Sequence, residues 1–185
     1  MPSEFEKMLN GEYYNPFDPE LTALRKNARE LFERLNQTSM GELSKRTKII
    51  KSLFGSTGKR IYVESNFRCD YGVNIHVGEN FYANFDCVIL DVAEVRIGDN
   101  CLMAPQVGIY TPGHPLDRQE RVSGLEFGLP ITIGNDCWIG GHAVINPGVT
   151  LGDNVVVASG AVVTKSFGDN VVIGGNPARV LKQLD

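Results

Sequence analysis

The sequence of 185 residues has no long apolar run, no excess of basic residues, only three histidines and a single tryptophan. Without about 20 consecutive apolar residues, it offers no candidate membrane-spanning helix. A formal net charge of −4 argues against a nucleic-acid-binding protein, in which lysine and arginine cluster. Residues 1–4 lack the basic and apolar segments of a signal peptide, so we expect a cytoplasmic protein.

Cysteine is also scarce, and the spacing of Cys69, Cys87, Cys101 and Cys137 matches no metal-binding motif. In a reducing cytoplasm these residues are expected to be core thiols. Cys101 and Cys137 occupy the same position of a sequence repeat, so we predict that they stack as neighbours.

The sequence does contain a six-residue repeat between residues 131 and 180. An aliphatic residue returns at every sixth position, and a small residue, Asn or Thr follows it. The aliphatic positions are Ile133, Ile139, Ile145, Leu151, Val157 and Val163. This period fits neither a helix nor simple alternation and is typical of a β-helix, in which each repeat supplies one short strand and one tight corner. With three strands in a coil, Ile133 and Leu151 should stack about 4.8 Å apart.

The same pattern occurs earlier in the chain, where segments 77–80 and 97–100 match segment 133–136. The thirty-six residues from the second of these segments to the third equal two coils. Residues 112–130, however, carry no repeat and contain several prolines and glycines. We therefore predict a loop at 112–130, and loops on a rigid scaffold are common sites of function.

We predict that residues 1–58 form a helical module and that residues 59–185 form the β-helix and its tail. The tail leaves the coil at Pro177. Ser3 and Glu6 form a capping box for a short first helix, and Asp18 with Pro19 predicts the start of a second. The second helix has an apolar stripe of Leu21, Leu24, Ala28, Leu31, Phe32 and Leu35. A third helix is predicted after the break at residues 38–41. The apolar residues expected to face the core are Leu43, Ile50, Leu53 and Phe54. A module of this size cannot bury a large hydrophobic core by itself. We therefore expect its helices to pack on the first coils or on a neighbouring subunit.

One histidine stands where chemistry is expected. His114 lies where the coil gives way to the loop, and Pro112 and Pro115 restrict its backbone. Histidine is a common general base because imidazole titrates near neutral pH, although a loop histidine can also simply bond within a turn. His76 should point outward from a strand and His142 lies at a corner, so both favour surface or interface roles.

Four segments in order, Phe67–Gly72, Asn80–Asp86, Tyr110–Leu116 and Gly174–Arg179, resemble the maltose/galactoside O-acetyltransferases of the hexapeptide acyltransferase superfamily. Residues 11–21 resemble that family's helical N-terminal module, so the resemblance covers nearly the whole chain. It implies a mainly β protein with a left-handed parallel β-helix. It also implies a homotrimer with active sites between subunits, acetyl-CoA as donor, and no metal.

The resemblance makes His114 the catalytic base. In that role it takes the proton from a sugar hydroxyl, typically the 6-hydroxyl, as the oxygen attacks the thioester directly in a ternary complex. Acceptor-binding positions carry over to Asp18, Asp70 and Asn84. Galactoside-type members carry a second acid immediately after the position of Asp91, whereas this chain has Val92, which favours the maltose/glucose branch.

Coenzyme A positions carry over from the same resemblance. They are Trp138, Gly141, Ser159, Thr164, Lys165, Arg179 and Lys182. The tryptophan is expected to pack against the pantetheine arm, corner backbone groups to bond its amides, and basic side chains to meet the phosphates.

Other functions remain open at this point. An acetyltransferase of this fold could act on a galactoside, serine or an antibiotic. The γ-type carbonic anhydrases share the solenoid but need three histidines around zinc. A scaffold without catalysis is a third possibility.

Overall fold

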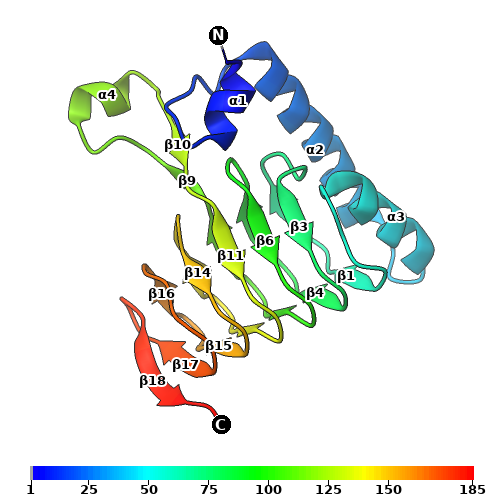
Figure 1. Cartoon of the computed structure of the whole chain (residues 1–185). Coiled ribbons are helices and arrows are strands. Elements are labelled where there is room, and N and C mark those ends of the chain that lie inside the picture. The colour runs from blue at the N-terminus through cyan, green and yellow to red at the C-terminus, as the bar shows by residue number, and fades with distance from the viewer. Residues whose placement is uncertain (1) are drawn as a thin grey trace.

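The protein is a stack of β-coils with helices at one end (Figure 1), as the computed structural model shows for residues 2–185. The described residues form the helices α1 (Glu4–Leu9), α2 (Pro19–Gln37), α3 (Leu43–Leu53) and α4 (Arg118–Val122). Helices α2 and α3 cover the N-terminal end of the stack, where α2 contacts β2 and α3 contacts β1, whereas α1 packs on α2 and β10. The expected packing on the first coils is therefore confirmed for α2 and α3.

Three sheets form the faces of the coil. Sheet 1 contains β1 (Ile61–Val63), β4 (Phe81–Ala83), β7 (Leu102–Met103), β12 (Trp138–Ile139), β15 (Val155–Val157), β17 (Val171–Gly174) and β18 (Arg179–Gln183). Sheet 2 contains β3 (Ile75–Val77), β6 (Val95–Ile97), β11 (Ile131–Ile133) and β14 (Thr150–Leu151). Sheet 3 contains β2 (Arg68–Cys69), β5 (Val88–Leu90), β8 (Gly108–Tyr110), β13 (Val144–Ile145) and β16 (Val162–Val163). Their strands pair in parallel, except that β18 is antiparallel to β17.

The six-residue period sets the register of the coils. Ile133 pairs with Leu151 as predicted, and the six aliphatic residues of the repeat are all buried. Cys101 and Cys137 each precede a residue of the β7–β12 pair and are buried free thiols, so they are neighbours as predicted. The two-coil count was wrong, because Ile97 pairs directly with Ile133. The thirty-six residues between them are one coil plus the inserted loop.

The corners depend on residues that tolerate a positive φ. After sheet 2, this conformation falls on Asn80, Asn100, Asp136, Asn154 and Asn170. Short polar side chains adopt it at lower cost than other residues that carry a Cβ. They also form a ladder along the edge: the amide of Asn80 donates to Asn100 at 2.7 Å, and that of Asn100 donates to Asp136 at 2.8 Å.

Glycine serves the same corners for a steric reason. A Cβ at Gly98 would lie 2.5 Å from the Asn135 side-chain oxygen and 2.8 Å from the carbonyl carbon of Gly134. Atoms cannot approach so closely, so the corner of one coil excludes a side chain because the next coil lies directly against it. The prediction that small residues fill these tight turns is confirmed here.

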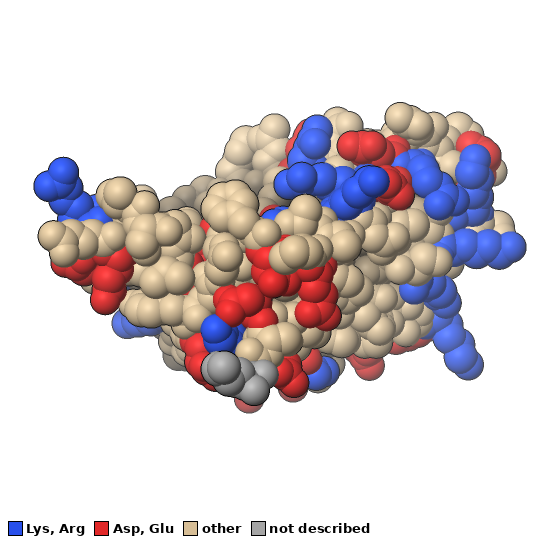
Figure 2. Space-filling view, turned by 90° about the horizontal axis from the view of Figure 1, so that it is seen from above, with Lys and Arg blue, Asp and Glu red and all other residues tan. Residues whose placement is uncertain are grey.

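The helices begin where the sequence indicates. The capping box of Ser3 and Glu6 is present in full, and Asp18 caps α2 with Pro19 at its first position. The stripe of α2 faces inward, with Leu21, Ala28, Phe32 and Leu35 buried. The prediction for Leu43 was wrong, because this first residue of α3 is 53% exposed and buried Ile49 and Arg46 face the core instead. The lysines of α3 are exposed to solvent. Figure 2 shows Lys and Arg side chains gathered toward one side of the molecule.

Helices α2 and α3 share one core with the coils, and their side chains close the first coil, whereas Met8 of α1 lies in a second, smaller cluster. The amide of Asn36 on α2 donates to the Phe67 carbonyl at 3.0 Å and accepts from the Phe67 N–H at 3.1 Å. At the other end the tail turns at a cis Asn176–Pro177 bond, and Ala178 donates to the carbonyl of Val162. The division at residue 58 into two units stays a prediction.

Candidate active site

The predicted loop at 112–130 is an ordered hairpin that carries α4. Strands β9 (Pro112–Gly113) and β10 (Phe127–Gly128) pair antiparallel and bring the two ends of the loop together. Asp117 caps α4 by accepting hydrogen bonds from the N–H groups of Gln119 and Glu120. His114 therefore follows a strand that is paired with β10, and its position is defined by the hairpin.

The N-terminal segment binds the far strand of this hairpin. Tyr14 and Glu126 form an antiparallel bridge, in which the Tyr14 N–H donates to the Glu126 carbonyl at 3.1 Å. The buried Tyr14 hydroxyl also donates to the Glu126 carboxylate at 2.8 Å. Tyr13 packs against Phe127, with ring centroids 5.9 Å apart. The helical module and the loop therefore form one wall together.

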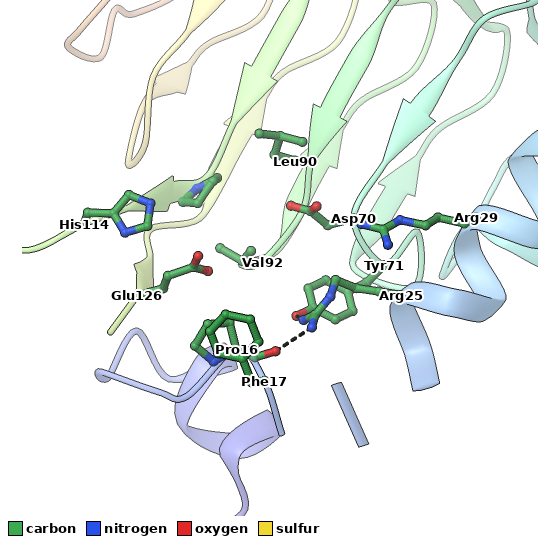
Figure 3. Close-up of a pocket in the computed structure, with 11 residues that line it drawn as sticks. Pro16, Phe17, Arg25, Arg29, Asp70, Tyr71, Leu90, Val92, His114 and Glu126 are labelled. Atoms are coloured by element: carbon green, nitrogen blue, oxygen red, sulfur yellow. Dashed lines mark hydrogen bonds between the residues drawn. The ribbon is translucent and has the colours of Figure 1, made fainter. Parts of the chain in front are cut away.

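A cavity of about 500 Å³ lies between the N-terminal module, the first coils and the loop (Figure 3). It is lined by Pro16, Phe17, Arg25, Arg29, Asp70, Tyr71, Leu90, Val92, Pro112, His114 and Glu126. Figure 3 shows the carboxylates of Asp70 and Glu126 pointing into the same space, with His114 to one side. A cavity of this size with convergent polar groups and apolar walls is typical of a small-molecule site.

Asp70 supplies a carboxyl group whose charge is unfavourable in this cavity. Burial is the main reason that its pKa rises to about 6, and the charge of Glu126 raises it further. The guanidinium groups of Arg25 and Arg29 act in the opposite direction and only partly offset these effects. Asp70 therefore changes its ionisation near pH 6, and such a raised pKa is common for carboxyl groups in functional sites.

Asp91 fixes the turn that carries Asp70. This fully buried carboxylate accepts hydrogen bonds from the N–H groups of Asp70 at 3.0 Å, Tyr71 at 2.9 Å and Asn74 at 3.3 Å. Burial raises the pKa of Asp91 to about 7, although the Tyr71 and Asn74 N–H groups favour the ionised form. Its partners are backbone groups, so its role is to hold the turn in place.

Arg25 links α2 to the floor of the cavity. Its guanidinium donates to the Tyr71 hydroxyl at 2.6 Å and to the Pro16 carbonyl, and it lies over the Tyr71 ring at 5.6 Å. Burial raises the pKa of Tyr71 to about 12, so this hydroxyl stays protonated. The donors of Arg25 are thus occupied by groups that shape the cavity.

Of the four predicted catalytic and acceptor positions, His114 and Asp70 line the cavity, whereas Asp18 and Asn84 do not. Asp18 accepts from the Glu20 N–H at 2.9 Å as the helix cap, two residues from the lining residue Pro16. Asn84 follows β4 at the corner before sheet 3, where its amide oxygen accepts from the Phe85 N–H. The roles predicted for these residues stay predictions.

The predicted coenzyme A positions lie along the C-terminal coils and not in the cavity of their own chain. Gly141 and Ser159 stack at the corner where the strands of sheet 3 begin. Thr164 and Lys165 follow β16, at the corner where the strands of that sheet end. Arg179 and Lys182 are exposed on β18. Trp138 stands on the outer face of sheet 1 and is 53% exposed. Their role in binding also stays a prediction.

The cavity residues that were not found from the sequence include Phe17, Arg25, Arg29 and Glu126. Arg25 lies on the polar side of a helix, where arginine is common. Phe17 is 79% exposed and follows no period. Glu126 lies in a loop without a repeat, and two pairings bring it to the cavity: that of β10 with β9 and its own bridge to Tyr14, which is distant in the sequence.

The remaining histidines lie away from the cavity. His76 is on sheet 2, where its ring bonds to the Ser56 hydroxyl at 2.9 Å, and His142 is exposed at a corner with a positive φ. Across residues 2–185, no three His, Cys, Asp or Glu side chains come together in a way that could hold a metal ion. The described helices include none with the length and apolarity needed to cross a bilayer.

Comparisons with known proteins agree with this architecture. A family model described as the maltose acetyltransferase hexapeptide capping motif matches residues 7–58, and one described as the hexapeptide repeat of succinyl-transferase matches residues 130–165. The galactoside O-acetyltransferase of Escherichia coli (strain K12) is 42% identical over 180 residues, which cover 97% of this chain and 89% of that protein. The chain belongs to the maltose and galactoside O-acetyltransferase family.

Solved structures from this family superpose over the whole chain. A maltose O-acetyltransferase from Clostridium difficile 630 is 52% identical, with a TM-score of 0.98, and the match covers 100% of this chain and 98% of that one. A galactoside acetyltransferase in complex with coenzyme A is 42% identical, with a TM-score of 0.96 and coverage of 100% and 92%. The fold is therefore the left-handed parallel β-helix of the family, and the chain is an acetyltransferase.

Proposed function

We propose that this acetyltransferase moves the acetyl group of acetyl-CoA to the 6-hydroxyl of a maltose- or glucose-type sugar, with His114 as general base. The observation that carries the proposal is the cavity that both His114 and Asp70 line, in a chain 52% identical to a maltose O-acetyltransferase. Carboxylates suit the binding of ring hydroxyls, and an imidazole in the same cavity suits the removal of a proton from one of those hydroxyls.

The reaction is a direct transfer. The sugar oxygen attacks the thioester carbonyl carbon while His114 takes the hydroxyl proton, and a backbone N–H donates to the oxyanion that forms. The C–S bond then breaks, the acetyl group stays on the sugar oxygen, and the thiolate of coenzyme A takes the proton from the imidazolium. No step needs a cysteine nucleophile, in keeping with four buried free thiols in the coils. Those thiols also suit the cytoplasm as the place of action.

The working unit is proposed to be a homotrimer with sites between subunits. Within one chain, Asn84, Gly141 and Ser159 precede strands of sheet 3 and lie where these strands begin. The cavity lies at the opposite side of the sheet, where its strands end. A second copy that presents its own sheet 1–sheet 3 corner to the cavity would unite these groups. The exposed outer face of sheet 1, with Leu102 and Trp138, offers apolar surface for such contact.

Acetyl-CoA is proposed to run along that groove toward His114. Trp138 would pack against the pantetheine arm, and the corner backbone at Gly141 and Ser159 would bond its amides. Thr164, Lys165, Arg179 and Lys182 are exposed polar or basic side chains toward the C-terminal end, where the phosphates would lie.

A survey of acceptors tests this function. Release of free thiol from acetyl-CoA should be fastest with maltose or glucose, slower with a galactoside, and near background with serine and chloramphenicol. The purified protein should elute at three times 20.3 kDa when its mass is measured by light scattering. Transfer to serine or an antibiotic in preference to every sugar would contradict the proposed acceptor class. A monomer with full activity would contradict the shared site.

The ionisation of Asp70 predicts how acceptor binding depends on pH. The pKa of Asp70 is raised to about 6, so the carboxylate is present above this pH and becomes a neutral acid below it. The KM for the sugar should therefore rise as pH falls through 6, by up to about tenfold per pH unit, because a carboxylic acid is a weaker acceptor of hydroxyl hydrogen bonds.

Steady-state kinetics between pH 5 and 8 check this dependence. In D70N the sugar KM should be high and nearly independent of pH, while the KM for acetyl-CoA should follow the wild type. An unchanged pH dependence of the sugar KM in D70N would show that another group titrates.

A further inference from the structure

Glu126 enters the cavity with one carboxylate oxygen held and the other free. The hydroxyl of Tyr14 donates to its Oε2 at 2.8 Å, and the backbones of the two residues pair on either side. Within residues 2–185, no donor bonds to Oε1 of Glu126. Because Tyr14 is buried and its own position is fixed by this strand bridge, the carboxylate is oriented before any ligand arrives.

The charge of Glu126 has no partner that serves the fold. No lysine, arginine or histidine of the described chain forms an ion pair with it, although Arg25 lines the same cavity. The guanidinium of Arg25 is instead bonded to Tyr71 and the Pro16 carbonyl. A half-buried carboxylate in a concave site has a desolvation cost that a hydrogen-bond donor from a ligand would offset.

The surroundings indicate what kind of donor fits. Val92, which is 3% exposed, lies beside Glu126 and gives that side of the cavity an apolar wall, and Asp70 stands across the same space (Figure 3). Two carboxylates with an apolar wall between them suit a sugar ring, which presents hydroxyl groups at its rim and C–H groups on its faces.

We propose that Glu126 is an acceptor-binding residue, whose Oε1 accepts a hydrogen bond from a ring hydroxyl that is not acetylated. The proposal rests on the proposed sugar acetyltransferase function and adds a residue that sets the choice of acceptor. Tyr14 is then the positioning residue that holds Glu126, so the helical module takes part in recognition through this one contact.

Substitution of Glu126 tests the proposal. E126A should raise the KM for the preferred sugar at least about tenfold and leave the KM for acetyl-CoA within about twofold, because a hydrogen bond to a charged group is lost. E126Q keeps an oxygen for Tyr14 and should raise the sugar KM by a smaller factor. E120A is the matched control, because Glu120 is an exposed carboxylate of the same loop and its loss should leave both KM values unchanged.

Monodeoxy derivatives of the sugar separate direct contact from a structural effect. For the derivative that lacks the bonded hydroxyl, wild type and E126A should have equal KM values, whereas the other derivatives should keep the tenfold difference. The assignment is wrong if E126A raises the KM by the same factor for every derivative, or if it does not raise the KM for the parent sugar. Wild type that acetylates no sugar would instead overturn the proposed function. Thermal unfolding of E126Q and E126A shows whether each variant is folded.

Discussion

Replacing His114 by alanine is expected to lower kcat for acetyl transfer at least about a hundredfold, equal to about 2.7 kcal/mol of transition-state stabilisation. The reason is that a sugar hydroxyl is a weak nucleophile until a base removes its proton. His114 is exposed at the cavity, and none of the described hydrogen bonds involves its side chain. Its loss should therefore leave the fold and the melting temperature nearly unchanged.

The informative readout is the division of the loss between kcat and KM. H114A should retain the KM for both substrates within a few-fold, because the binding groups remain. The control is H76Q, since His76 lies on the outer face of sheet 2 and glutamine can still bond to Ser56. Equal losses in H114A and H76Q, or a loss in KM alone, would contradict general-base catalysis by His114.

Replacing Arg46 by methionine is expected to lower the free energy of unfolding by at least about 3 kcal/mol. Its guanidinium is almost fully buried and donates to three carbonyl oxygens, those of Leu35 at 3.1 Å, Thr38 at 2.8 Å and Val63 at 2.7 Å. Two of these close the C-terminal end of α2, where a positive charge is favourable, and the third belongs to β1. Methionine fills a similar volume but removes the donor to the carbonyls of Thr38 and Val63, whereas the Leu35 carbonyl keeps the N–H and hydroxyl of Thr38 as donors.

Thermal unfolding measures this effect. A loss of 3 kcal/mol lowers the melting temperature of a domain this size by about 10 °C. R34M is the matched control, because Arg34 is an exposed residue of α2 and its loss should shift the melting temperature by no more than about 2 °C. Similar shifts in both variants would show that the three carbonyl contacts of Arg46 contribute little.

Much of the fold could be predicted because short sequence patterns determine its strands, corners and helix starts. The six-residue period carries both the strand and the corner, so the register of Ile133 and Leu151 follows from counting. The helix caps at Ser3 and Asp18 are equally local. Counting residues failed across the loop, because it cannot distinguish an inserted hairpin from a further coil. The helical pattern failed at Leu43, which lies on the first turn of α3 and faces solvent.

The site was only partly predictable because it is assembled from distant segments. His114 and Asp70 were found through motifs that resemble a family, and both line the cavity. Glu126 was not found, since its position depends on a strand bridge to Tyr14. Asp18 lies beside the cavity and not in its lining, because its carboxylate caps a helix. Such relations are set by tertiary packing, which no local pattern records.

The two ends of the solenoid have a consequence for self-association. A stack of parallel coils exposes backbone donors and acceptors at both ends, and these could accept coils from another molecule without limit. Here Asn36 occupies both polar backbone groups of Phe67 at one end, and β18 reverses direction over β17 at the other. A further parallel coil cannot continue the ladder of β17 at this end, which disfavours end-to-end polymerisation into fibres and favours association through the lateral faces.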